Sequence, residues 1–426
     1  MKRVLIICYY WPPAGGPGVQ RWLKFVKYFR EFGIEPVVFV PDNAHYPLQD
    51  ESFVKEVPED VEIIKFPIKE PYRFAKWFSK SKTKQISSGI ITEKKPSALE
   101  KFMLYVRGNL FIPDARVGWV KPSVKFLKQY LTQQDIDTII TTGPPHSLHL
   151  IGMHLKDALK VRWIADFRDP WTTIHYHKSL QLSKASAEKH KRLEKEVLTK
   201  ADRVVVTSWN TQIEFAKITS NPIHVITNGF DAQEVIHSNL DDKFSIVHVG
   251  SLLSNRNPEV LWKVLSNLVQ EHEDFKKSLQ IKLVGTVGVE IKESIQEHGL
   301  RHFTELPGYV SHSEALQLQH DAQVLLLVEM DKEETKAIIP GKLFEYLRAE
   351  RPILGFGPQG TDIKKILDET QSGRYFGYSE EEELKQELLQ LFDNYKHSKL
   401  RVLSRDIQQY SRVALTEKMA TLIKEL

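Results

Sequence analysis

The amino-acid sequence predicts an α/β protein with two domains, each built on a parallel β-sheet. The chain has 426 residues, and at about 100–200 residues per domain this length favours two or three domains. Short apolar segments alternate with helical patterns, and this alternation starts a second time near residue 244. Strands that alternate with helices are typical of parallel sheets with crossover helices. The polar segment over residues 228–243 marks the expected boundary.

The first domain is expected over residues 1–228. A helix is predicted over Val19–Phe32, and Gly33 is expected to end it. The strands of this domain are predicted from short apolar runs at Val4–Cys8, Pro36–Val40, Val61–Lys65, Thr138–Thr141, Val161–Asp166, Arg203–Thr207 and His224–Ile226.

The second domain is expected over residues 243–402, and residues 403–426 are expected to form one or two last amphipathic helices. One helix is predicted to begin near Pro258, with Asn257 as its N-cap. Ser311 and Ser379 are each followed by a glutamate three positions later, which is the capping-box pattern. The strands of this domain are predicted at Phe244–Val249, Ile281–Val284, Gln323–Val328 and Pro352–Phe356.

Composition narrows the class of protein. The net charge of +4 makes no case by itself for a nucleic-acid partner. Cys8 is the single cysteine, so no disulfide can form within the chain, and a reducing compartment is expected. No apolar run approaches the ~18 residues of a membrane span. We therefore expect a cytoplasmic protein, with contact to the inner face of the cell membrane left open.

A basic segment over about residues 69–121 interrupts the strand–helix alternation. From Lys69 to Arg107 there are ten Lys and Arg but three Asp and Glu, with several aromatic residues between them. The segment is interpreted as an insertion of one or two helices with loops. It is either a solvated surface insertion or an element that meets anionic lipid headgroups or the acceptor. A nucleic-acid patch is the third alternative, and no binding motif accompanies it.

Loops at the carboxyl ends of first-domain strands hold candidate site residues, because ligands of open parallel sheets bind there. Gly15 and Gly16 lie in a glycine-rich loop before a helix, where backbone N–H groups can meet a phosphate. Asp166, Arg168 and Asp169 close another strand. They are either a substrate-facing cluster or an internal ion pair. His146 follows the neighbouring strand and is either an acceptor-side base or a loop residue.

The second domain repeats this logic. Gly250 ends a strand and Arg256 precedes the next helix, where it can pair with a diphosphate. Lys342 lies at the start of a later helix, close to the expected phosphates. Glu345 lies one turn into that helix, where its carboxylate can accept hydrogen bonds from ribose hydroxyls.

Together these residues resemble glycosyltransferases of the GT-B fold, in particular the large retaining family 4. Segments that carry the resemblance are PPAGGPGVQR, Asn228-Gly229-Phe230-Asp231, His248-Val249-Gly250 with Arg256, and PGKLFEYLRAERPIL. The resemblance implies two Rossmann-like domains that face each other across a cleft, with the C-terminal helix crossing back onto the first domain. It also implies that Glu345 holds the donor ribose.

The chain departs from the family pattern at three positions. The family usually carries two glutamates eight positions apart, and the first of them falls at Ala337. Lys336, Lys342 and Glu334 are candidates to replace it. Ser251 stands where a basic residue is usual, and Arg168 stands in place of the first-domain histidine.

By this resemblance the protein moves a sugar with retention from a UDP- or GDP-linked donor to a saccharide or lipid-linked acceptor of cell-surface polysaccharide synthesis. Gly16 N–H, Arg256 and Lys342 would stabilise the leaving diphosphate, so that no metal and no cofactor is required. Asp166, Arg168 and Asp169 would face the acceptor. The alternatives are a nucleotide-sugar epimerase of the same fold and a non-catalytic nucleotide-sugar-binding subunit.

Overall fold

The computed structural model describes residues 1–46, 48–70, 98–174, 177, 180–231, 238–400, 402 and 404–426. The chain divides into two compact units. Unit 1 comprises Met1–Thr227 and Arg412–Leu426, and unit 2 comprises Asn228–Ser411. Residues 71–97 of the predicted insertion lie outside the described residues, whereas its later part, residues 98–121, is described and contains the helix Ala98–Leu110.

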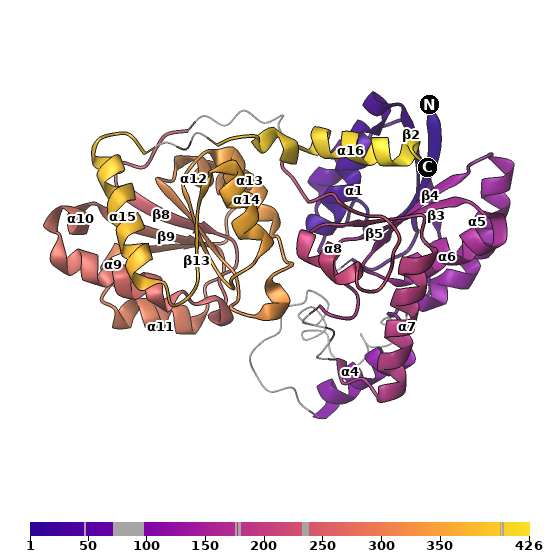
Figure 1. Ribbon diagram of the computed structural model, residues 1–426, viewed down its shortest axis with the longest axis horizontal. Helices are drawn as coiled ribbons and strands as arrows, with labels where there is room; N and C mark the ends of the chain where they lie inside the picture. Colours follow the sequence, from indigo (N-terminus) through magenta and orange to yellow (C-terminus); the bar gives the residue numbers. More distant parts are fainter. Residues whose placement is uncertain are drawn as a thin grey trace. The chain divides into compact units, whose positions relative to one another are not determined.

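Unit 1 is an α/β unit around a parallel sheet (Figure 1). The strand order within the described residues is β3-β2-β1-β4-β5-β6-β7. The strands are β1 (Lys2–Ile7), β2 (Ile34–Pro41), β3 (Glu62–Phe66), β4 (Thr138–Gly143), β5 (Arg162–Phe167), β6 (Arg203–Val206) and β7 (Ile223–Val225). The helices are α1 (Pro17–Tyr28), α4 (Ala98–Leu110), α5 (Val117–Gln133), α6 (Ser147–Leu159), α7 (Lys184–Lys200), α8 (Trp209–Phe215) and α16 (Arg412–Lys424).

Alternate side chains of β1 pack into two separate cores, one on each face of the sheet. Leu5 and Ile7 join the core that includes buried residues of α5, α6 and α7. Val4 and Ile6 join the opposite core, which holds buried residues of α1 and α16. Because successive side chains of a strand point to opposite faces, a strand covered on both faces reads as a continuous apolar run. This pattern is why the strands of unit 1 were visible in the sequence.

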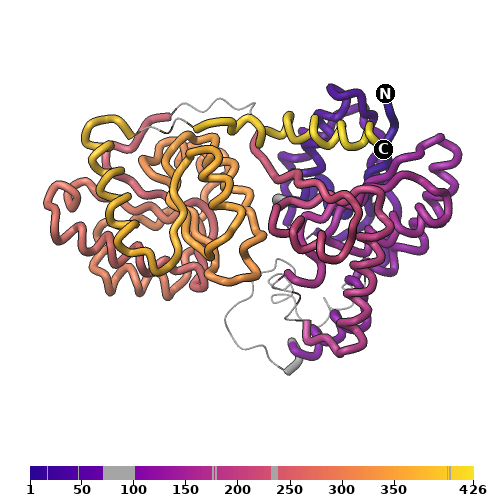
Figure 2. Tube along the Cα trace, viewed as in Figure 1, coloured from indigo at the N-terminus to yellow at the C-terminus, as the bar shows by residue number. Residues whose placement is uncertain are grey.

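The segment α16 completes the second core of unit 1. Its buried residues Met419 and Ile423 lie in the same cluster as Trp22 and Phe25 of α1, and the two helices run side by side (Figure 2). Lys2 Nζ also donates to the Ile423 carbonyl at 3.0 Å, which ties the start of β1 to this helix. Residues 412–426 are therefore an integral part of unit 1.

Unit 2 is a second α/β unit with its own core. Its parallel sheet has the order β10-β9-β8-β11-β12-β13 within the described residues. The strands are β8 (Phe244–Val249), β9 (Leu279–Val284), β10 (Thr304–Gly308), β11 (Val324–Val328), β12 (Ile353–Phe356) and β13 (Gly373–Phe376). The helices are α9 (Glu259–Glu271), α10 (Glu273–Ser278), α11 (Val289–Glu297), α12 (His312–Asp321), α13 (Gly341–Ala349), α14 (Asp362–Thr370) and α15 (Glu381–Lys396).

The helix caps of unit 2 follow the sequence predictions in part. Ser311 Oγ accepts the Glu314 N–H at 3.3 Å, so this N-cap is confirmed. The prediction for Asn257 was wrong, because α9 starts after Pro258 and Asn257 Oδ1 instead accepts from the Trp262 indole at 2.7 Å. Ser379 does not cap α15 either, since Glu380 holds that position.

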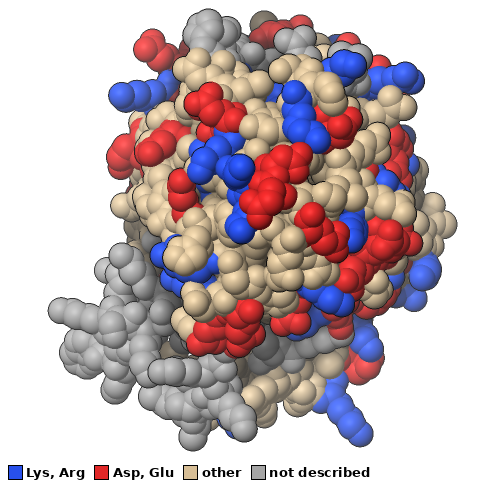
Figure 3. Space-filling model, turned by 90° about the vertical axis from the view of Figure 1, so that its left-hand side faces the viewer, with Lys and Arg blue, Asp and Glu red and all other residues tan. Residues whose placement is uncertain are grey.

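Charges of both signs are interspersed on the face of unit 2 shown in Figure 3. Ion pairs of Lys263 with Glu381 (2.6 Å) and Lys385 with Glu271 (2.8 Å) join α9 to α15 on the surface. Pairs this exposed contribute little to stability.

Candidate functional site

The predicted donor-binding residues of unit 2 gather at the carboxyl end of β8. Gly250 follows this buried strand with a φ of +112°, a conformation that favours glycine. A Cβ on Gly250 would lie 3.1 Å from Lys342 Nζ, which is tighter than most side-chain contacts. Glycine at this position therefore lets the ammonium of α13 approach the end of the strand.

Lys342 is held against a neutral partner. His248 Nδ1 donates to the Leu326 carbonyl at 2.9 Å, which leaves Nε2 to accept from Lys342 Nζ at 3.3 Å. Burial and the neighbouring Lys342 keep the pKa of His248 well below its usual value, so the imidazole is uncharged at neutral pH. Burial lowers the pKa of Lys342 to about 8, although the carboxylate of Glu329 opposes this shift.

Arg256 brings a second cation to the same place. It ends a short 3-10 helix (Ser254–Arg256), and its Nη2 lies 3.3 Å from Glu329 Oε2. Glu329 directly follows β11 and is 1% exposed. Burial raises the pKa of Glu329, while Arg256 and Lys342 counteract the rise. Two cations and one carboxylate therefore share this end of the sheet.

Glu345 lies on α13 one turn after Lys342. Gln319 of α12 donates from Nε2 to Glu345 Oε2 at 3.0 Å. Gln319 is buried, whereas Glu345 is half-buried and has a second oxygen for other donors. The next residue, Tyr346, anchors α13 by accepting the Val249 N–H at 2.9 Å. The site thus combines two cations suited to an anion with a carboxylate suited to hydroxyl groups.

In unit 1 the glycine-rich loop leads directly into α1. Gly15 N–H bonds to the Leu48 carbonyl at 2.9 Å, and Gly16 is the N-cap of α1 with a φ of +97°. A Cβ on Gly18 would lie 2.1 Å from Arg168 Nη1, so only glycine admits the guanidinium there. Gly18 was not singled out from the sequence.

Asp166 is completely buried and fully hydrogen-bonded. Arg21 of α1 reaches it with Nη2 at 2.8 Å and Nε at 3.3 Å, and Trp22 Nε1 and Thr142 Oγ1 bond to it at 2.8 and 2.9 Å. Desolvation opposes its ionisation, but Arg21 together with the hydrogen bonds from Trp22 and Thr142 outweighs this effect and holds the pKa of Asp166 below its usual range. The structure thus places Asp166 in an internal ion pair, and the partner is Arg21 instead of Arg168.

Arg168 lies against Gly18, just after the glycine loop of unit 1, and Asp169 is the next residue in the chain. Arg168 donates from Nε to the Gly143 carbonyl at 3.3 Å, also donates to the Pro144 carbonyl, and lies 5.8 Å from the Tyr10 ring centroid. Asp169 is half-buried, and desolvation raises its pKa while Arg168 opposes the rise. A carboxylate with a raised pKa beside an arginine is suited to accept a proton or a hydroxyl hydrogen bond.

His146 is the N-cap of α6 and stacks on Trp171 with ring centroids 4.9 Å apart. Neither ring nitrogen has a hydrogen-bond partner among the described residues. Burial, helped by the neighbouring His149, keeps the pKa of His146 well below its usual value. A neutral imidazole with open nitrogens can accept a proton, but its 7% exposure limits access to a substrate.

Several residues of these networks were given no site role from the sequence: Arg21, His248, Gln319 and Glu329. Glu329 had a visible signal, because it is a charged residue directly after the apolar run Val324–Val328. Arg21 had none, since its partner Asp166 lies 145 positions away in the chain.

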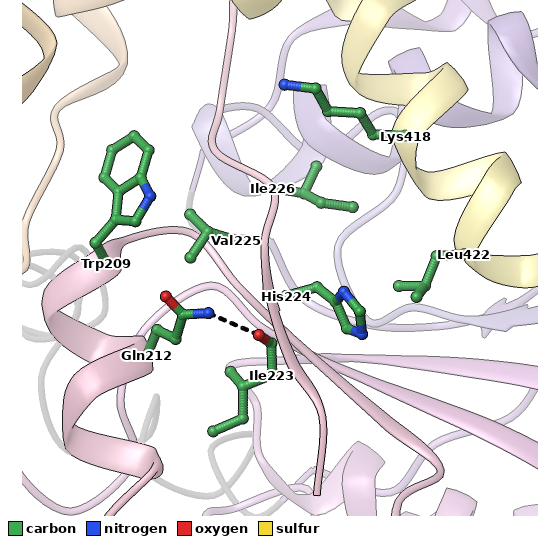
Figure 4. Close-up of a pocket in the computed structure, with 8 residues that line it drawn as sticks. All are labelled: Trp209, Gln212, Ile223, His224, Val225, Ile226, Lys418 and Leu422. Atoms are coloured by element: carbon green, nitrogen blue, oxygen red, sulfur yellow. Dashed lines mark hydrogen bonds between the residues drawn. The ribbon is translucent and has the colours of Figure 1, made fainter.

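A separate cavity of unit 1, of about 390 Å³, holds none of the predicted site residues. It lies between α8, the segment around β7, and α16 (Figure 4). It is lined by Trp209, Gln212, Ile223, His224, Val225, Ile226, Lys418 and Leu422. Gln212 Nε2 donates to the Ile223 carbonyl at 2.7 Å and covers part of the wall. The chemistry described above lies elsewhere.

Solved structures share this architecture over the whole chain. Anabaena HepE in complex with UDP matches with a TM-score of 0.61 at 14% identity, over 100% of both chains. Sucrose-phosphate synthase from Thermosynechococcus elongatus matches with a TM-score of 0.61 at 14% identity, over 100% of this chain and 99% of that one. A putative UDP-N-acetylglucosamine 2-epimerase from Listeria monocytogenes matches with a TM-score of 0.54 at 11% identity, over 100% and 96%. These likenesses define the fold as GT-B.

Sequence comparison then gives the family. The model of Glycosyltransferase Family 4 matches residues 18–234, which is just over half of the chain. The chain therefore belongs to glycosyltransferase family 4 and is a transferase. A comparison with curated protein sequences found no match.

The Asp166 network leads to a stability prediction. Asp166→Asn leaves Arg21 fully buried without its counter-ion, so we expect the free energy of unfolding of unit 1 to fall by about 3–5 kcal/mol at neutral pH. Urea unfolding monitored by tryptophan fluorescence measures this loss. Asp157→Asn is the matched control, because its pair with Lys200 is exposed and should contribute less than about 1 kcal/mol.

The same variant should show a defined pH dependence. The folded-state pKa of Asp166 is depressed, so its carboxylate contributes fully to the free energy of unfolding above the unfolded-state pKa of about 3.9. This contribution is lost as the pH falls through the lower folded-state pKa. The difference in the free energy of unfolding between wild type and Asp166→Asn should therefore stay constant from pH 7 to about pH 4. A difference no larger than that of Asp157→Asn would contradict the structural role.

Proposed function

We propose that this chain transfers a sugar, with retention, from a UDP- or GDP-linked donor to a saccharide or lipid-linked acceptor in cell-surface polysaccharide synthesis. The observation that carries the donor assignment is that Lys342 lies against Gly250 while Lys342 and Arg256 both act on Glu329, with Glu345 one turn along α13. HepE has also been solved with UDP and glucose, which supports a nucleotide-sugar donor.

In this proposal each residue of unit 2 has a separate task. Lys342 and Arg256 neutralise the diphosphate and stabilise the charge that develops on it as the bond to the sugar breaks. Gly250 keeps the end of β8 open for close approach of the phosphates. Glu345 accepts hydrogen bonds from the ribose hydroxyls, and its bond from Gln319 fixes its orientation. The two cations allow the leaving group to be stabilised without a metal ion.

Residues of unit 1 are proposed to meet the acceptor. Arg168 and Asp169 are the candidates, with His146 close behind them on α6. Asp166 holds α1 against β4 and β5 and contributes by positioning the strand end that carries Arg168. Gly16 is proposed to offer its backbone N–H group to the donor, whereas the Gly15 N–H is already bonded to the Leu48 carbonyl.

Membrane contact is proposed through α4 and the basic segment around it. Phe102 and Leu110 of α4 are 63% and 71% exposed, and Tyr105 is 46% exposed. Exposed apolar and aromatic side chains within a basic segment are typical of elements that bind anionic lipid surfaces. The described residues contain no helix long and apolar enough to cross a membrane.

Nucleotide binding tests the donor site. Thermal unfolding with UDP, GDP and ADP should show stabilisation by one of them, by about 2.7 kcal/mol at a hundredfold excess over its Kd. Glu345→Ala and Arg256→Ala should both lose this stabilisation, whereas Lys364→Ala, which removes a lysine paired with Asp368 on α14, should keep it. Stabilisation by no nucleotide in a folded sample would refute the donor site.

Product analysis by NMR then separates the candidate activities. The nucleotide sugar that stabilises the protein is incubated with candidate acceptors. A new glycosidic linkage with the donor's anomeric configuration supports retaining transfer, and an inverted linkage contradicts retention. An isomerised donor would indicate an epimerase, and unchanged donor with intact binding would indicate a non-catalytic subunit.

The lowered pKa of Lys342 predicts how nucleotide affinity depends on pH. A diphosphate needs the charged ammonium, so the affinity should be full below pH 8 and should fall as the pH rises through about 8. At pH 9 we expect binding about tenfold weaker, since one pH unit changes the protonated fraction about tenfold. Isothermal titration calorimetry measures this profile. Lys342→Met should bind weakly at every pH, and a wild-type profile that stays flat to pH 9 would refute the role of Lys342.

Lipid binding by α4 is tested by co-sedimentation with vesicles. The double variant Phe102→Ser/Leu110→Ser should bind vesicles of phosphatidylglycerol and phosphatidylcholine several-fold more weakly than wild type. Vesicles of phosphatidylcholine alone should bind both proteins weakly. Val289→Ser, which removes an apolar residue 66% exposed on unit 2, is the control and should bind like wild type. Equal binding by the double variant would remove α4 from the membrane contact.

A further inference from the structure

Glu329 is a buried carboxylate that the proposed donor contacts do not require. It is 1% exposed at the end of β11, and one oxygen, Oε2, has no hydrogen-bond donor among the described residues. Oε2 lies 3.3 Å from Arg256 Nη2 in an ion pair, but the two groups are not oriented for a hydrogen bond. A buried carboxylate is expected to be both paired and hydrogen-bonded. Glu329 meets this expectation only in part.

The cations around Glu329 are also incompletely compensated. Lys342 is held by the neutral imidazole of His248 at 3.3 Å, so its nearest polar contact carries no negative charge. Lys342 and Arg256 are the cations that act on the Glu329 carboxylate, and Glu345 on the next turn of α13 is a second carboxylate that acts on Lys342. Such an arrangement holds its cations together in the absence of a ligand, and it still attracts an anion.

The backbone of Glu329 is fixed, so its carboxylate remains at the site. Tyr378 donates from its hydroxyl to the Glu329 carbonyl at 2.6 Å, and the Glu329 N–H bonds to the Phe356 carbonyl at 2.8 Å. A Cβ on Gly357 would lie 3.2 Å from Glu329 Cβ, which shows how closely the neighbouring loop is packed. A bound anion would therefore meet Glu329 as a negative neighbour.

We propose that Glu329 is the internal counter-ion of the donor site. It stabilises Lys342 and Arg256 side by side while the site is empty, and the donor's diphosphate takes over that role on binding. Glu329 and the diphosphate repel each other, so Glu329 weakens nucleotide binding and favours release of the nucleoside diphosphate after transfer. This inference rests on the proposed function.

The substitution Glu329→Gln separates this role from a merely structural one. Without the carboxylate the two cations repel each other, so the empty variant should unfold at a lower temperature than wild type. The same substitution removes the repulsion from the ligand. The stabilisation by the nucleoside diphosphate that stabilises wild type, and by inorganic pyrophosphate, should therefore be larger, with a several-fold smaller Kd by calorimetry.

Two further variants serve as controls. Glu194→Gln removes a buried carboxylate of unit 1 that accepts hydrogen bonds from Thr172 and the Trp171 N–H, so it should change the unfolding temperature of the empty protein alone. Glu329→Asp keeps the charge and should keep the wild-type response to ligand. Circular dichroism checks that each variant is folded.

The outcomes distinguish the two proposals. A lower unfolding temperature of Glu329→Gln together with a larger ligand response supports the counter-ion role. A ligand response that is unchanged or smaller, in a wild type that does bind, overturns this role and leaves the donor site standing. If Glu329→Asp, which keeps the negative charge, loses the ligand response, then Glu329 acts by positioning Arg256 and its charge is not what matters. That outcome overturns the proposal. If wild type responds to no nucleoside diphosphate, the proposed function fails and this inference fails with it.

Discussion

The constraint behind both units is that their parallel strands are covered on both faces. Helices and apolar side chains exclude charge from the length of strands such as β1 and β8. Charged groups can enter the interior only where strands end, beside the loops that follow. At those ends, helix N-termini and open backbone groups also become accessible. The location of the chemistry in this protein is thus a consequence of how its sheets are packed.

The two units use this constraint in opposite ways. In unit 1, Asp166 and Arg21 neutralise each other, and further donors occupy the remaining lone pairs of the carboxylate. Such a closed network is rigid and has no electrostatic demand for a ligand. In unit 2, Lys342 meets a neutral imidazole and Arg256 meets a carboxylate at a loose distance. The charges in unit 1 are fully compensated and form a structural ion pair, whereas those in unit 2 are incompletely compensated and can take up an anion.

The fold was predictable from sequence where burial leaves a simple pattern. The strands β1 and β8 are mostly apolar, and both were predicted: β1 from Val4 onward, and β8 over its whole length. The edge strands β10 and β13 were missed, because Glu305 and Arg374 give them the polar composition of loops. Helix caps depend on backbone dihedral angles, which the sequence does not give. Asn257 was therefore predicted as an N-cap, whereas its side-chain oxygen accepts from the Trp262 indole.

The candidate site was predictable in its local part only. Gly250, Lys342 and Glu345 lie in short segments whose spacing reveals them as residues of a strand end and a helix start. Partners that the fold brings together from distant segments leave no such trace, and Arg21 with Asp166 is one example. The missing family glutamate at Ala337 drew attention to its near neighbours, whereas the buried carboxylate beside Lys342 is Glu329, on the preceding strand end.

The contribution of α16 to unit 1 has a consequence for how the chain is made. Synthesis runs from the N-terminus, so α1 emerges early and exposes Trp22 and Phe25, while the helix that covers them emerges only after all of unit 2. Throughout that interval the nascent first unit carries an uncovered aromatic surface, which is the kind of surface that chaperones recognise and that aggregates form from.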